Sequence, residues 1–167
     1  MRLSLPTISL VTATAAAFAL AVALASQHWM GLVPCPLCLL ERWPWRAAIV
    51  LGLIAFVTPA RIARPLLVLA AVVILADAAV AFVHVGVEHR LWPSPLPECQ
   101  APLLSGSIAD RLRTLPAEPS ASCQDALYLV PAIPISMATM DMAYALVVAA
   151  GLAILLLNGR RTHEGRA

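Results

Sequence analysis

Four cysteines are the residues of this chain best suited to covalent chemistry. Cys35 and Cys38 form a close Cys-Pro-Leu-Cys pair, whereas Cys99 and Cys123 stand far from it and from each other. Two residues between partners close a very small ring, which hardly restrains an unfolded chain, and cysteines in this spacing are commonly redox-active. The close pair therefore predicts thiol–disulfide exchange.

Other uses of the cysteines fit less well. A zinc site favours two close pairs or a histidine at ligand spacing, and neither half of this set has one. Haem attachment needs a histidine directly after the pair, where this chain has Leu39. Two structural disulfides suit the even count, but a static bridge suits the close pair poorly. We therefore predict no metal ligands here and a redox role for the pair.

The surroundings of the pair favour a reactive thiolate. Pro34 and Pro36 predict an extended segment, and Pro44 suits the first turn of a helix, so Cys38 is expected just before a helix N-terminus. The positive end of the helix dipole and the guanidinium of Arg42 would both stabilise a Cys38 thiolate. The alternative for Arg42 is an interfacial side chain that pairs with an acid or with lipid phosphate.

The composition indicates a membrane protein. Of the 167 residues, 61% are hydrophobic and 12% are charged, against about 25% charged in soluble domains. The mean hydropathy is +0.86. All 11 basic residues are arginine, and no basic cluster occurs, so nucleic acid is not an expected partner.

Apolar segments predict an all-α membrane protein, a four-transmembrane-helix bundle that forms a single membrane domain over residues 1–167. The expected spans are about 8–30, 43–60, 66–87 and 137–157. A cleaved signal peptide is the alternative for the first segment, but its length and the further apolar segments favour retention. The redox loops are then 31–42 and 88–136, and the second is long and rich in proline, with eight of the 14 prolines.

The charges predict how the bundle is oriented. The termini and the loop between the second and third spans carry six arginines and one acidic residue. The two cysteine loops together with Arg46, at the outer end of the second span, carry five arginines and six acidic residues. Because basic residues stay cytoplasmic, we expect both termini inside and both cysteine loops outside, where disulfides persist. An outer interfacial belt would hold the four tryptophans, Trp29, Trp43, Trp45 and Trp92.

Several short motifs follow one another along the chain. CPLCLLER at 35–42 stands at the outer end of the first span, LWPSP at 91–95 precedes Cys99, and ISMA at 135–138 follows the lone Cys123. With the four predicted spans, this order resembles the disulfide bond formation protein B (DsbB) family. The resemblance implies a bacterial inner-membrane enzyme that takes electrons from a soluble periplasmic thioredoxin-fold oxidase (DsbA-like) and passes them to a membrane quinone, ubiquinone or menaquinone.

The resemblance also implies a role for each cysteine. Cys99 would form the mixed disulfide with the soluble partner, and Cys123 would be its mate. Cys35 would exchange with this loop pair, while Cys38 would face the quinone with Arg42 beside it. A proline-stiffened outer loop and an apolar slot between helices are compatible with these steps.

Three polar residues share one face of the third span. Asp77, His84 and Glu88 are spaced so that, at about 100° per residue, they form one stripe facing the bundle interior. We expect a neutral Asp77 that is hydrogen-bonded to a neighbouring helix. For His84, a quinone role, either contact with a quinone oxygen or transfer of its protons, and a structural hydrogen bond stand as equal alternatives.

Two rival functions remain at this stage. A vitamin K epoxide reductase-like protein also has four core spans and loop cysteines, but there the loop cysteines precede the Cys-X-X-Cys, whereas here the close pair comes first. A non-enzymatic membrane protein with structural disulfides, or with Cys and Met ligands, is the other. Its methionines argue against it, because Met137, Met140 and Met142 cluster away from the cysteines.

The orientation generates a first prediction. A membrane-impermeant thiol reagent added outside should label all four cysteines in the reduced protein, and a cysteine introduced as Arg61→Cys should react only from the cytoplasm, because basic residues stay inside. Labelling of intact cells against lysed cells measures this. Loop cysteines reached only from the cytoplasm would contradict the prediction.

Overall fold

The computed structural model describes residues 4–99, 121–129 and 132–164. It contains the α-helices α1 (Leu5–His28), α2 (Pro36–Val57), α3 (Ala60–Glu88) and α5 (Met137–Glu164), and the short 3-10 helix η1 (Pro97–Cys99). The described residues form no β-strand, only one bridge between Tyr128 and Ser136. The predicted all-α class is therefore confirmed.

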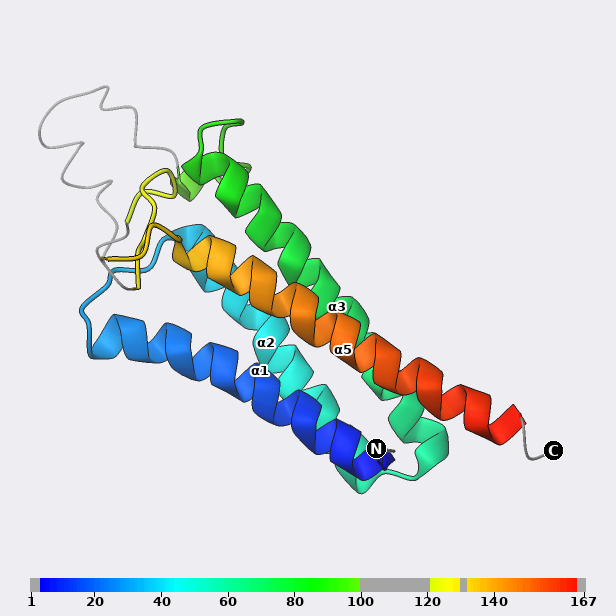
Figure 1. Ribbon diagram of the computed structural model, residues 1–167. Helices are drawn as coiled ribbons and strands as arrows, with labels where there is room; N and C mark the ends of the chain where they lie inside the picture. The colour runs from blue at the N-terminus through cyan, green and yellow to red at the C-terminus, as the bar shows by residue number, and fades with distance from the viewer. Residues whose placement is uncertain (1–3, 100–120, 130–131, 165–167) are drawn as a thin grey trace, which may run out of the picture.

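The long helices lie side by side (Figure 1). Helix α2 packs against α1 and α3, and α3 packs against α5, while α1 and α5 touch only sparsely. The first turn of α1, the last turn of α5 and the α2–α3 connection lie at one end of the bundle, and the described cysteine segments lie at the other (Figure 1).

Three of the helices in the described part of the chain are long and apolar enough to cross a membrane. They are α1, α3 and the part of α5 from Met137 to Asn158. Helix α2 carries Glu41, Arg42 and Arg46 in its first half, which lowers its apolar character. Its role as a fourth span, the single-domain assignment over 1–167 and the long proline-rich loop stay predictions, since 100–120 and 130–131 lie outside the described residues.

The beginning of α2 differs from the prediction. The second span was expected to start at residue 43 after an extended loop 31–42, but α2 already begins at Pro36. Proline suits the first helical position because its missing N–H would be unpaired there anyway. Pro44 lies inside the helix instead of near its first turn. This shift places Cys35 at the helix N-cap.

Small side chains bring the helices close together. Ala16 on α1, Ala48 on α2, Ala78 on α3 and Ala145 on α5 all belong to one buried cluster. Small residues allow the backbones of membrane helices to approach and gain van der Waals contact. The position of each helix, and therefore of the polar groups it carries, depends on this close packing.

The closest approach of α1 and α2 generates the second prediction. A Cβ at Gly52 would lie 3.0 Å from the backbone nitrogen of Ala13 and 3.1 Å from the carbonyl oxygen of Ser9. We expect Gly52→Val to lower the free energy of unfolding by about 1–3 kcal/mol, because it overpacks this contact. Gly151→Val is the matched control, since a Cβ there meets no described atom within 4 Å. Equal melting temperatures in detergent would contradict the prediction.

Candidate redox site

The close cysteine pair lies at the N-terminus of α2. Cys35 is the N-cap, and its Sγ accepts a hydrogen bond from the backbone N–H of Cys38 at 3.1 Å. The two Sγ atoms are 2.8 Å apart, with both cysteines present as free thiols. The expectation that Cys38 precedes the helix is therefore wrong, because the N–H groups of the first turn point at Cys35 instead.

This arrangement favours ionisation of Cys35. Hydrogen bonding from the Cys38 side chain lowers the pKa of Cys35, and the backbone N–H of Cys38 acts in the same direction, against the opposing effect of burial. The sequence had assigned the activated thiolate to Cys38. The structure assigns it to Cys35, because the cap sulfur receives the donors.

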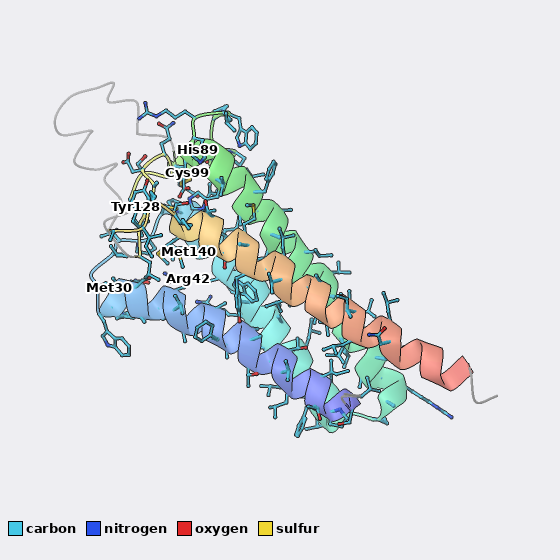
Figure 2. All side chains as sticks on the ribbon, in the orientation of Figure 1. Met30, Arg42, His89, Cys99, Tyr128 and Met140 are labelled. Carbon is cyan, nitrogen blue, oxygen red and sulfur yellow. A yellow bond between two sulfur atoms is a disulfide. The ribbon has the colours of Figure 1, made fainter. Side chains whose placement is uncertain are left out.

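The second pair lies beside the first. Cys99, at the end of η1, and Cys123 form a disulfide. Both are buried in one cluster with Cys35, Leu37 and Val87, and Cys38 packs against that cluster. Four cysteines from distant parts of the sequence thus meet at one end of the bundle, where Figure 2 labels Cys99.

His84 contacts the close pair directly. Its Nε2 lies 3.4 Å from Cys35 Sγ, and its Nδ1 lies 2.8 Å from Glu41 Oε1. Glu88 Oε1 is 4.0 Å from Nε2, and Ser136 Oγ donates to Glu88 Oε2 at 2.6 Å. The predicted stripe therefore does face the bundle interior. There His84 contacts Cys35.

Asp77 belongs to the same stripe and is fully buried. Among the described residues, neither of its carboxylate oxygens has a hydrogen-bond partner. The Asp77 carboxyl nevertheless interacts with that of Asp141 on α5, so the expected bond to a neighbouring helix stays a prediction.

Arg42 is buried and faces α1. Its guanidinium donates from Nη1 to Gln27 Oε1 at 2.7 Å and from Nη2 to the carbonyl oxygen of Ala23 at 3.4 Å. Its Nε has no hydrogen-bond partner among the described residues. Arg42 lies inside the bundle end (Figure 2), and the neighbouring Glu41 binds His84 instead.

A cavity of about 330 Å³ adjoins the pair where α1 and α5 diverge. Most of its wall is apolar, and its polar lining includes Cys38, Arg42 and Asp141. A mostly apolar pocket with a few placed polar groups is typical of small-molecule sites. His84 is not among the residues that line this cavity.

Several contributors to the site were missed or misplaced by the sequence reasoning. Trp45 was assigned to the interfacial belt, but it is 2% exposed and donates from Nε1 to Asp141 Oδ1 at 2.9 Å. Trp29 and Trp43 are exposed as expected. The sequence does contain a signal for Asp141, because it is a lone acidic residue in an apolar span. The same feature marked Asp77 as a candidate functional residue.

The three-dimensional contacts also change the case for a metal. Ligand atoms of Cys35, Cys38 and His84 all lie within 4.8 Å of one another. The sequence argument against zinc relied on local spacing, which does not detect a histidine from another helix. Three such atoms are one fewer than the four ligands of a structural zinc site, so the expectation of no metal ligands stays a prediction.

Packed apolar helices with two cysteine pairs at one end define a multi-pass membrane protein with a candidate redox site. A family model described as disulfide bond formation protein DsbB matches residues 6–156. The chain belongs to the DsbB family.

Curated relatives carry the name disulfide bond formation protein B. The Marinobacter nauticus protein is 36% identical over 102 residues, which cover 58% of this chain and 55% of that protein. The Pasteurella multocida protein is 31% identical over 116 residues, covering 63% and 60%, and the Stutzerimonas stutzeri protein is 31% identical over 122 residues, covering 70% and 69%. The chain thus spans less than two thirds of the length of the first two. No solved structure matches the chain significantly.

The cap geometry generates the third prediction. Because hydrogen bonding from Cys38 lowers the pKa of Cys35, alkylation of Cys35 in the reduced protein should stay fast as the pH falls below the usual thiol range. Cys38→Ala removes the side-chain donor and should move the midpoint of this pH profile upward. Mass spectrometry after timed alkylation measures the rate at Cys35 alone. A midpoint that is unchanged in Cys38→Ala would contradict the prediction.

Proposed function

We propose that this chain is a quinone-dependent thiol:disulfide oxidoreductase of the bacterial inner membrane. It reoxidises a soluble periplasmic dithiol oxidase of the thioredoxin fold (DsbA-like) and passes the electrons to a membrane quinone. The observation that carries the proposal is the burial of Cys99, Cys123 and Cys35 in one cluster, with Cys38 packed against it and facing an apolar cavity. Membership of the DsbB family supports the same reading.

The proposed exchange uses both pairs in turn. A partner thiolate attacks Cys99, which forms a mixed disulfide and releases Cys123. The second partner thiolate then attacks the partner sulfur of this mixed disulfide, which forms the partner's own disulfide and releases Cys99 as a thiol. The reduced loop pair passes its two electrons to an oxidised Cys35–Cys38 bond through attack of Cys123 on Cys35. The adjacency of the pairs supports this route, because exchange needs direct contact between sulfur atoms.

The cavity suits a quinone head group. A bound quinone would act as the two-electron acceptor. Arg42 Nε and Asp141 Oδ2 are buried polar atoms without a hydrogen-bond partner among the described residues, and both residues line the cavity. Arg42 would hold a carbonyl oxygen and stabilise negative charge there, while Cys38 presents its sulfur at the same wall.

The proposed orientation puts the cysteine end in the periplasm and both termini in the cytoplasm. In this proposal α2 crosses as the fourth span, which agrees with its packing between α1 and α3. Its buried Glu41 and Arg42 bond to other helices instead of facing lipid, which reduces the cost of placing them at membrane depth.

The static alternatives are less well supported. A structural bridge has no use for an imidazole beside its sulfur, yet His84 lies against Cys35. A vitamin K epoxide reductase-like assignment conflicts with the order of the cysteines and with the family match over 6–156.

The role of the loop pair generates the fourth prediction. In Cys123→Ser, the free Cys99 thiolate should attack the disulfide of an oxidised DsbA-like partner and accumulate as a mixed disulfide, because Cys123 is absent and cannot displace the partner by re-forming the loop disulfide. Non-reducing electrophoresis of the variant mixed with oxidised partner measures this complex. Cys99→Ser is the control that should form no such complex. Full turnover by Cys123→Ser would mean that the loop disulfide is structural.

Arg42 generates the fifth prediction. Arg42→Met should reduce quinone-dependent turnover by about 2–4 kcal/mol in transition-state stabilisation, as for loss of one oxyanion donor. Arg42→Lys should rescue only partly, since a point charge lacks the planar fork. Arg46→Met is the matched control, because Arg46 is exposed one turn further along α2 and stacks on Trp43. Steady-state quinone reduction with excess reduced partner measures this effect. Unchanged kinetics in Arg42→Met would refute the proposed role of Arg42 in quinone reduction.

A further inference from the structure

His84 is held at both ring nitrogens. Glu41 Oε1 lies 2.8 Å from Nδ1, and Cys35 Sγ lies 3.4 Å from Nε2. His84 is 2% exposed and Glu41 is 7% exposed. An acid, an imidazole and a thiol thus form one buried line across α2 and α3.

The geometry points to His84 as the proton acceptor of Cys35, with Glu41 as the residue that positions the ring. A carboxylate accepts from Nδ1–H, which leaves the Nε2 lone pair directed at the sulfur. The same logic orients the base in acid–histidine–nucleophile triads. This role goes beyond binding of the quinone, and it rests on the proposed exchange at Cys35.

The charges around the ring agree with this role. From α2, Glu41 faces Nδ1, and Cys35 and Cys38 lie at the other side. From α3 itself, Glu88 lies 4.0 Å from Nε2, and from α5 the Asp141 carboxyl also interacts electrostatically with the ring. Two carboxylates next to the ring stabilise the imidazolium that forms when Nε2 takes a proton. A purely structural hydrogen bond would need only one of these contacts.

The proton has a defined place in each step. When Cys99 attacks Cys123 in a Cys123–Cys35 mixed disulfide, the Cys99–Cys123 bond forms, and Cys35 leaves with the electron pair as a thiolate beside His84. The released Cys35 sulfur takes up a proton and rests as a thiol. For the Cys35–Cys38 bond to form again, Cys35 gives this proton to His84 Nε2, and its thiolate attacks the Cys38 sulfur. A quinone would accept the two electrons, and the protons of the two thiols equal the two that it takes up on reduction.

The first test reads the tautomer. In protein labelled with ¹⁵N-histidine and kept reduced with a chelator present, the neutral His84 ring should carry its proton on Nδ1. Glu41→Gln should weaken this preference, because the amide is a poorer acceptor. The His84 resonance is assigned by its loss in His84→Gln. A neutral ring protonated at Nε2 would overturn the proposal, since that nitrogen could not then accept a proton from Cys35.

The second test reads the sulfur. With Cys99 and Cys123 both changed to alanine, the pH profile of alkylation at Cys35 is compared in the parent, His84→Gln and His89→Gln. We expect the midpoint to rise by about one pH unit or more in His84→Gln, with the high-pH plateau rate kept. His89 is exposed at the end of the same helix and should change nothing.

These outcomes separate the possible roles. A changed plateau with an unmoved midpoint in His84→Gln would show that the ring only shapes access to Cys35, and it would overturn the proposal. Neither test needs quinone or partner. Their failure is therefore distinguishable from failure of the proposed function, which the partner complex and quinone reduction report.

Discussion

The hydrogen bond from the backbone N–H of Cys38 to Cys35 Sγ is the interaction on which the redox site depends. It sets Cys35 as the N-cap of α2 and fixes the first turn of that helix. The same sulfur lies against His84 Nε2 and belongs to the cluster that holds the Cys99–Cys123 disulfide. One atom therefore links a helix end, a base and the second cysteine pair, so each of them acts on the ionisation or exposure of Cys35.

The buried polar groups around this cap also organise the bundle. Glu41 binds α3, Arg42 binds α1, and Trp45 binds Asp141 on α5, so α2 is hydrogen-bonded to all three other helices. Such bonds inside an apolar bundle restrict how the helices pack, because a displaced polar group would be left without a partner. The sparse contact between α1 and α5 leaves room for the cavity beside Cys38.

Periodicity and hydropathy were sufficient to predict the all-α class and the three apolar helices α1, α3 and α5, because long apolar segments are strong signals. These signals did not predict where α2 begins, because Pro36 and Pro44 each fit the first turn of a helix and only packing decides between them. The contact of His84 with Cys35 joins residues 49 apart. Tertiary packing alone brings His84 and Cys35 together. The same holds for Trp45 and Asp141, because the aromatic side chain of Trp45 had suggested an interfacial position.

The central claim is that electrons pass from the loop pair through Cys35 and Cys38 to a quinone. Acid-quenched thiol trapping of all four cysteines in purified protein tests it, after reduction by a DsbA-like partner and with or without a short-chain ubiquinone or a menaquinone analogue. The account predicts four trapped thiols without quinone, and loss of all four on its addition, with one quinone reduced per disulfide formed. Thiols at Cys35 and Cys38 that persist with both quinones in excess would contradict it.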